Sequence, residues 1–437
     1  MTVPTTRPIR RRHSPQRGFT LIELLVALTA GLLVSIAAFS LARNASSFFQ
    51  KEARLSAAQH AVMIGISRLT SDLQRASYLT VPNSDNIDYQ MVGKTATNWP
   101  KGMQRLAGIT ILEGGSATEA QSNGLTPDAL VLSGSFDSTE LFGVRTIIAS
   151  GTGAIIYLQT NDSAWARAKA AESRGAPALE SIFKAGRMVR IADNYGWSTY
   201  GIVASYDEVT NPSAPFITLA STPAPAERSS SKHGGIHGLA ASNYTINTVS
   251  RIRYDLRSVD DAAKYPQYAN LFTRARHAAS AYHRGALEPI RTELVRVELD
   301  AANAGDEYAE VDSTLDVVAE YAVDLKFGMT VESATPTLPA TLAKYPIHNS
   351  TFSATTGYDI ADDLNQTNSE PERLRAVQVR LTVRAAEADR DVTIPASSGG
   401  GLYRFALEDS SGAARGFARV RTVVTEVALP NNYAPDS

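Results

Sequence analysis

Residues 17–41, RGFTLIELLVALTAGLLVSIAAFSL, decide the fold class of this 437-residue chain. Glu23 is the only ionisable residue between Phe19 and Leu41. As a helix, this stretch of roughly 23 residues is about 34 Å long, which is enough to cross a hydrocarbon core of about 30 Å. The sequence therefore predicts a membrane-spanning helix near the N-terminus.

The residues ahead of this stretch are basic. Arginine occupies positions 7, 10, 11, 12 and 17, before any acidic residue. Positive charge on this side predicts a cytoplasmic N-terminus, with the rest of the chain on the opposite side of the membrane. A secretory signal peptide has a shorter apolar region and an A-x-A-like cleavage site, and neither feature is found here.

Glu23 needs a partner or access to water, because an ionised carboxylate is costly inside a membrane. If the chain is cut between Gly18 and Phe19, the new α-amine of Phe19 carries positive charge at about the same depth. In a helical array, Glu23 of one subunit then pairs with Phe19 of its neighbour. The alternative is that Glu23 reaches the lipid headgroups by itself.

The run Arg17-Gly18-Phe19-Thr20-Leu21-Ile22-Glu23, followed by an apolar helix, resembles the class III signal of type IV prepilins and type II secretion pseudopilins. The resemblance implies cleavage after Gly18, N-methylation of Phe19 and a filament-assembly role for Glu23. The implied partners are other major and minor pilins, the prepilin peptidase/methyltransferase, the inner-membrane pilus assembly machinery and the lipid bilayer.

The helical pattern continues beyond the membrane, and no proline occurs between Phe19 and Pro82. Apolar residues at spacings of three and four form one face, which predicts an amphipathic helix that packs on a sheet; they are Leu55, Ala58, Val62, Ile66, Leu69, Leu73 and Ala76. We expect four segments: a leader (1–18), a transmembrane helix (19–41), an amphipathic periplasmic helix (42–80) and a β-rich globular head (81–437).

The head contains short runs rich in branched residues, which predict strands between turns. These runs are 128–133, 144–149, 154–159, 188–192, 201–205, 216–219, 251–256, 294–299, 317–327, 374–383 and 417–428, with short helices expected at 165–174 and 268–284. The fold class is α+β and pilin-like, with a long N-terminal helix packed on a large antiparallel β-rich C-terminal domain.

Segments near the C-terminus indicate which group of pilins the chain resembles. Residues 374–384 (LRAVQVRLTVR) and 421–431 (RTVVTEVALPN) are similar to the final strands of PilW-type minor pilins, and residues 320–325 (EYAVDL) support this. The resemblance implies a minor pilin that primes pilus assembly at or near the tip. A J-type minor pseudopilin of type II secretion and a filament-displayed adhesin or ligand-binding module are the alternatives. Insertions near 221–235 and 260–285 depart from the pattern.

Little in the sequence points to catalysis, a cofactor or a metal. The chain has no cysteine, and 42 basic residues nearly balance 44 acidic ones, which disfavours nucleic acid as the main partner. His233 and His237 are separated by glycines, and the acidic stretch 362–370 lacks EF-hand spacing. We expect no catalytic, cofactor-binding or metal-ligating residues.

Two surface features leave alternatives open. Arginines 373, 375, 380 and 384 on one predicted strand form either a solvated face or a groove for an acidic partner surface or DNA. Tyr195, Trp197 and Tyr200 form a suggestive aromatic cluster, which in strands more often belongs to the core.

Overall fold

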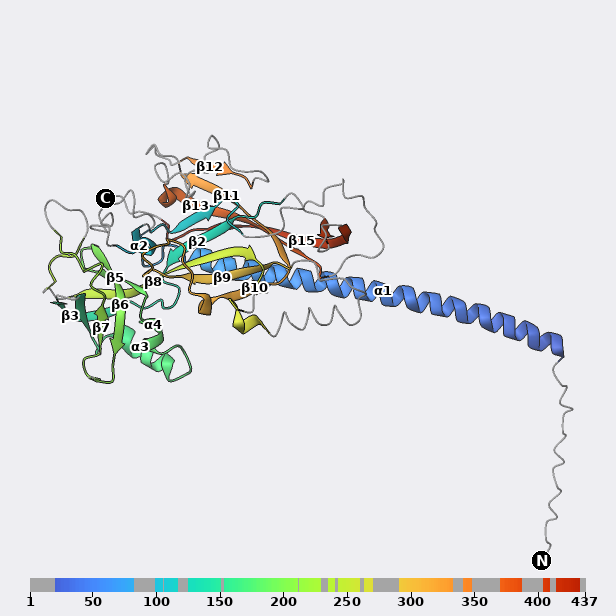
Figure 1. Cartoon of the computed structure of the whole chain (residues 1–437), viewed down its shortest axis with the longest axis horizontal. Coiled ribbons are helices and arrows are strands. Elements are labelled where there is room, and N and C mark those ends of the chain that lie inside the picture. The colour runs from blue at the N-terminus through green and yellow to red at the C-terminus, as the bar shows by residue number, and fades with distance from the viewer. Residues whose placement is uncertain are drawn as a thin grey trace, which may run out of the picture. The chain divides into compact units, whose positions relative to one another are not determined.

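The computed structural model describes residues 20–81, 99–104, 106–116, 125–150, 153–210, 212–228, 235–239, 243–259, 263–269, 291–332, 341–347, 370–386, 404–408 and 414–432. The chain divides into two compact units, residues 1–54 and residues 55–437. The α-helices within the described ranges are α1 (Leu21–Gln74), α2 (Lys101–Gln104), α3 (Ser163–Glu172) and α4 (Leu179–Ile182) (Figure 1).

The strands pair antiparallel throughout, as expected for the head. They are β1 (Ile109–Leu112), β2 (Ala129–Gly134), β3 (Phe142–Ser150), β4 (Gly153–Leu158), β5 (Met188–Ala192), β6 (Ser198–Asp207), β7 (Phe216–Leu219), β8 (Tyr244–Arg257), β9 (Glu293–Leu299), β10 (Asp316–Ala319), β11 (Ala322–Glu332), β12 (Leu342–Tyr345), β13 (Leu374–Arg384), β14 (Arg404–Glu408) and β15 (Ala414–Ala428). The long N-terminal helix and the large antiparallel domain confirm the predicted α+β class.

Six strands close into a barrel, in the order β8-β3-β4-β7-β6-β5, because β5 also pairs with β8. Branched side chains from all six strands contribute to its core, including Val144, Ile156, Ile191 and Ile217. Helices α3 and α4 add Trp165 and several aliphatic side chains to the same core. Closure leaves this part of the head without an open strand edge.

Strand β8 belongs to two structures at once. Its first part, residues 244–249, pairs with β3 and β5 in the barrel. Its second part, residues 250–257, lies between β2 and β9 in a sheet that ends at β1 and β10. One continuous strand therefore joins the barrel to this sheet, which we call the first sheet. The second sheet has the order β12-β11-β13-β15-β14.

The C-terminal part of α1 packs into the main hydrophobic core of the head. The buried residues of α1 in this core are Ala58, Val62, Ile66, Leu69 and Leu73, followed by Ala76 just beyond the helix. Apolar side chains of β1, β2 and β8 from the first sheet and of β11, β13 and β15 from the second belong to the same core. The stripe predicted from the sequence is confirmed, with Leu55 half-buried at its start.

Gly65 lets the helix approach its neighbours closely. A Cβ atom at this position would lie 2.8 Å from a Leu381 methyl group and 3.1 Å from the Cβ of Ala319. Glycine weakens a helix interior by about 1 kcal/mol relative to alanine. Here it also avoids a clash with side chains from both sheets.

A buried polar contact fixes the helix against the first sheet. One oxygen of the Asp72 carboxylate, Oδ2, accepts hydrogen bonds from the Tyr254 hydroxyl at 2.7 Å and from Nε of Arg296 at 2.8 Å. Tyr254 lies on β8 and Arg296 on β9, so one carboxylate joins α1 to two adjacent strands. Asp72 is 3% exposed, which makes the loss of these partners costly.

The end of α1 is held by the last described residues of the chain. The helix ends at Gln74, well before Pro82, since Ser77 and Leu79 adopt left-handed backbone angles. The Asn431 side-chain amide donates to the carbonyl oxygen of Gln74 at 2.8 Å. The Ser77 hydroxyl donates to Oδ1 of the buried Asn432 at 2.6 Å. Two consecutive asparagines thus provide partners for the backbone and turn where the helix stops.

Most predicted strands are confirmed within a few residues, but the run 317–327 is wrong as a single strand. The chain turns at Glu320 and Tyr321, so β10 pairs with β9 in the first sheet and β11 enters the second sheet. Tyr321 has a φ of 57°, and its N–H donates to the Glu293 carboxylate at 2.9 Å.

The predicted helix 165–174 is confirmed as α3. The predicted helix 268–284 lies outside the described residues from position 270, and Pro266–Tyr268 forms a 3-10 turn before it.

We predict that Asp72→Ala lowers the free energy of unfolding by about 3 to 5 kcal/mol, since it leaves Arg296 charged and half-buried without its partner. Arg68→Ala is the matched control, because Arg68 is half-exposed and lies 3.9 Å from the same carboxylate. Its loss should change stability by about 1 kcal/mol or less. Denaturant unfolding of the full chain in detergent measures both, and an Asp72→Ala midpoint equal to that of the wild type would contradict the prediction.

Candidate functional site

The first part of α1 has the length and composition of a membrane span. Among the described helices it alone meets both requirements, and none of its apolar window is buried inside the protein. Exposed leucine, isoleucine and phenylalanine side chains include Leu25, Leu32, Ile36 and Phe39. An uncovered apolar surface of this length requires lipid or other helices around it, which fits membrane anchoring.

Glu23 lies in the first turn of α1 and caps the helix with Thr20. Its Oε2 atom accepts hydrogen bonds from the backbone N–H of Thr20 at 2.9 Å and from the Thr20 hydroxyl at 3.0 Å. The Thr20 hydroxyl oxygen in turn accepts the N–H of Glu23 at 3.3 Å. This reciprocal arrangement is a capping box, and it provides partners for N–H groups that the helix cannot pair internally.

The capping box also gives Glu23 a polar environment within its own chain. Sequence reasoning considered two environments for this carboxylate: a neighbouring subunit's amine and the lipid headgroups. The role of Thr20 was missed, although a threonine followed three residues later by glutamate is a recognised signal. Gly18 and Phe19, the other two predicted site residues, lie outside the described residues.

The predicted solvated face of arginines is wrong for Arg380 and Arg384, which are both buried. Arg380 lies directly opposite Lys326 in the β11–β13 pairing, and like charges in that position repel. Two carboxylates offset the repulsion: Asp324 lies 2.9 Å from Nε of Arg380, and Asp128 lies 2.7 Å from Nζ of Lys326.

The remaining arginines, of which Arg373 lies in the 3-10 turn just before β13, also have local partners. The Arg384 guanidinium donates to the carbonyl oxygens of Ala385 and Ala386 and lies 4.8 Å from the ring centroid of Tyr321. Arg373 pairs with Glu370, and Arg375 pairs with Glu332. All four arginines therefore have partners within the chain, and two of them are buried, which counts against an open groove for DNA.

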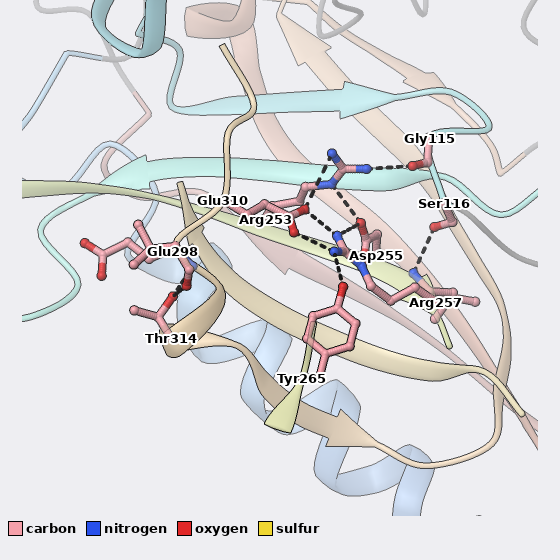
Figure 2. A network of polar contacts seen from close by, with 11 residues as sticks. Gly115, Ser116, Arg253, Asp255, Arg257, Tyr265, Glu298, Glu310 and Thr314 are labelled. Carbon is pink, nitrogen blue, oxygen red and sulfur yellow. Dashed lines mark hydrogen bonds and ion pairs between the residues drawn. The ribbon is translucent and has the colours of Figure 1, made fainter. Parts of the chain in front are cut away.

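A second ionic network covers the outer end of β8 (Figure 2). Arg257 binds Glu310 through two hydrogen bonds of 2.6 Å and donates to Asp255 through Nε at 2.7 Å. Nε of Arg253 lies 2.8 Å from Asp255, and its Nη2 donates to the carbonyl oxygen of Gly115. Burial works against ionisation of Glu310, but its bonds with Arg257 hold its pKa below the ordinary value. The network joins segments that lie far apart in the sequence. Its arginines are paired with its carboxylates, so these residues do not form a surface of a single charge.

Two carboxyl groups have a pKa in the range of general acids, since burial raises the pKa of Asp128 to about 6 and that of Glu293 to about 7. Lys326 and Arg291, respectively, oppose these shifts. A general acid must reach its substrate. Both carboxylic acids are fully buried, so their surroundings indicate structural roles.

The metal candidates gain no support from the described part of the chain. Within it, no group of three or more histidine, cysteine, aspartate or glutamate side chains is arranged to hold an ion. His233 and residues 362–369 lie outside the described residues. His237 is described, and its Nδ1 lies 2.8 Å from the Asp193 carboxylate.

The aromatic cluster divides into two environments. Tyr200 is 1% exposed and belongs to a small core with Met103 and Leu106, as expected for an aromatic side chain in a strand. Tyr195 is 70% exposed, so the expectation of a core position is wrong for this residue. It lies in the turn between β5 and β6, where its side chain has no sheet face to pack against.

Comparison with known proteins gives one match. The prokaryotic N-terminal methylation motif matches residues 13–39, a segment that contains Gly18, Phe19 and Glu23. Searches of curated proteins and of solved structures gave no match. The motif and the apolar first part of α1 together support a pilin-type protein of a pilus or pseudopilus, with a structural rather than an enzymatic role.

Proposed function

We propose that this chain is a minor pilin, a structural component that primes assembly of a type IV pilus at or near its tip. The observation that carries the proposal is the position of the methylation motif at the start of α1. The first part of this helix is apolar and exposed, and its C-terminal part packs into the core of the β-rich head. The first part of α1 enters the membrane and then the filament, and the second part carries the head.

The proposed processing begins at the cytoplasmic face of the inner membrane. Prepilin peptidase cuts after Gly18, and the new N-terminus at Phe19 is methylated. The basic leader favours this orientation and places the head in the periplasm. Removal of 18 residues from 437 leaves a mature chain of 419 residues.

Glu23 acts in assembly through its charge. In the membrane its carboxylate has the capping bonds of Thr20, and in the filament it also meets the Phe19 amine of a neighbouring subunit. Attraction between opposite charges is much stronger at low dielectric than in water. The pair therefore favours entry of the helix into the array over its remaining alone in lipid.

The size of the head supports a minor role. A head that begins at Leu55 and contains a barrel in addition to two sheets is bulky for a subunit repeated at every position of a filament. A tip or priming complex accommodates such a head more readily. A minor pseudopilin of type II secretion is the second candidate, because it has the same anchor and a β-rich head.

Gly18→Ala should leave an uncut, membrane-retained precursor, because the peptidase motif requires a residue as small as glycine before the cleavage point. Intact-mass analysis of the purified protein measures the cut. A wild-type chain that starts at any residue other than Phe19 would contradict the assigned site.

Glu23→Gln should preserve cleavage and folding and should reduce recovery with partner subunits at least tenfold. Glutamine keeps an oxygen that can accept the Thr20 hydrogen bonds but removes the charge, and losing one partner of a buried ion pair typically costs about 3 to 5 kcal/mol. Crosslinked co-purification from membranes and sheared filaments measures the effect.

Thr20→Val is the matched control, since it removes the capping hydroxyl but keeps the carboxylate. If capping of α1 were the function of Glu23, Thr20→Val would impair assembly and Glu23→Gln would not. If charge pairing is its function, the two results are reversed. Normal recovery of both variants would leave Glu23 as a residue that merely reaches the headgroups.

The proposed function predicts that this protein is rare in the fibre. Quantitative proteomics of sheared filaments should find it at a few per cent or less of the major subunit, and deletion should reduce the number of filaments. Its detection as the main component of the filament would exclude the minor role. Loss of protein export with normal pili on deletion would favour the pseudopilin.

A further inference from the structure

A group of aromatic and polar side chains, exposed except for the half-buried Trp197, lies on the barrel beside the turn that joins β5 to β6. It consists of Tyr195, Trp197, Arg228 and His237, and we call it the hairpin cluster. Tyr195 and Trp197 belong to the turn, whereas Arg228 and His237 come from the connection between β7 and β8. None of the four belongs to the hydrophobic core of the barrel.

The Asp193 carboxylate fixes the hairpin cluster in place through hydrogen bonds. It is almost completely buried, and Oδ1 accepts the backbone N–H groups of Tyr195 and Trp197, both at 2.9 Å. Oδ2 accepts the backbone N–H of His237 at 3.2 Å and lies 2.8 Å from Nδ1 of its ring. These four contacts fix the turn and the imidazole together.

The hydrogen bond to Asp193 also decides what His237 offers to a ligand. With Nδ1–H donated to the carboxylate, Nε2 of a neutral imidazole is an acceptor. The His237 side chain is 41% exposed, and Nη1 of Arg228 lies 3.4 Å from its Nε2 atom. A hydrogen-bond acceptor and a guanidinium with several donors therefore lie side by side at the surface.

Ring contacts hold the other side chains in place. The Arg228 guanidinium carbon lies 3.8 Å from the centroid of the Trp197 ring, which positions the guanidinium over the aromatic face. The Tyr195 and His237 ring centroids are 4.7 Å apart. Because each displayed side chain already has a neighbour that orients it, a ligand meets a preformed surface and orders few side chains on binding.

The local charge disfavours a polyanion. Arg228 is the only arginine or lysine of the hairpin cluster, and the Asp193 carboxylate lies beside the cluster. Glu227, whose carboxylate accepts the N–H of Leu239 at 2.7 Å, adds a second negative charge. Binding to a nucleic-acid backbone depends on a positively charged groove. The described residues at this site carry no positive excess, so they favour an uncharged polar ligand.

We propose that the hairpin cluster binds a neutral saccharide. A pyranose ring has an apolar face of C–H groups and an edge of hydroxyl groups, each of which both donates and accepts hydrogen bonds. The exposed ring of Tyr195 packs against the C–H face, and Arg228 donates to hydroxyl oxygens. A sugar hydroxyl that displaces the 3.4 Å contact of Arg228 Nη1 donates a hydrogen bond to Nε2 of His237. The site thus adds recognition of a sugar surface to the proposed assembly role and does not depend on that role.

The full-length chain in a zwitterionic detergent, applied to an array of neutral oligosaccharides, tests the proposal. Alkyl glycoside detergents are avoided because their sugar headgroups would compete. The strongest neutral oligosaccharide is then titrated by calorimetry. Tyr195→Ala and Arg228→Ala should each raise the Kd by about tenfold or more, which corresponds to the loss of about 1.4 kcal/mol of binding free energy.

Tyr157→Ala is the matched control, because Tyr157 is a half-buried tyrosine on β4 of the same barrel, where its ring lies 5.7 Å from that of Phe216. It should bind the oligosaccharide as the wild type does. Thermal unfolding checks that all variants are folded, and Arg228→Gln replaces Arg228→Ala if that variant is not.

Three outcomes would overturn the proposal. One is that no neutral oligosaccharide binds above background. Another is that Tyr195→Ala and Arg228→Ala bind as tightly as Tyr157→Ala. The third is binding restricted to single-stranded DNA or sulfated chains and abolished by moderate salt, which would assign the surface to a polyanion. None of these outcomes bears on filament assembly, which the Glu23 variants test separately.

Discussion

The head depends on the burial of one helical stripe. Val62, Ile66, Leu69 and Leu73 of α1 share a single core with apolar side chains from both sheets. At about 1.5 to 3 kcal/mol for each fully buried aliphatic side chain, these four contribute roughly 6 to 12 kcal/mol. The net stability of a domain is about 5 to 15 kcal/mol. Removing the helix would therefore expose the inner faces of both sheets and disrupt the main core of the head, although the separate core of the barrel contains no residue of α1.

Buried charges determine how the pieces fit around this stripe. Ion pairs taken out of water add little net stability, but a misplaced partner leaves an uncompensated charge. Asp72 accepts only one register of α1 against Tyr254 and Arg296. Likewise, the facing cations Lys326 and Arg380 require Asp128 and Asp324 at their sides. Apolar packing supplies most of the stability, and these contacts select the arrangement.

A feature could be predicted from the sequence when the interactions behind it join residues that are close in the sequence. The apolar run, Glu23 and the stripe on α1 were predictable, because lipid and helical periodicity act on neighbouring residues. Strand positions were also largely predictable from branched residues between turns.

Features that depend on distant partners were not predictable. The barrel closes through pairing of residues 188–192 with residues 245–249, which no local pattern reveals. The burial of Arg380 depends on Asp324, 56 positions earlier. The break at Tyr321 contains neither glycine nor proline and depends on the carboxylate of Glu293. In the candidate site, the signal for Thr20 was local and was missed, whereas the surface position of Tyr195 depends on how the turn leaves the sheet.

The continuity of β8 has a mechanical consequence. Tension applied to the barrel passes along the backbone of residues 244–257 into the first sheet without crossing a flexible linker. There the strand is bonded to β2 on one side and β9 on the other, and Tyr254 connects it to α1 through Asp72. A pull along the strand loads these hydrogen bonds together, in shear, whereas a pull across the strand would peel them apart one after another. The head therefore resists force best when the force acts along β8, from the barrel toward the part of the strand that contacts α1.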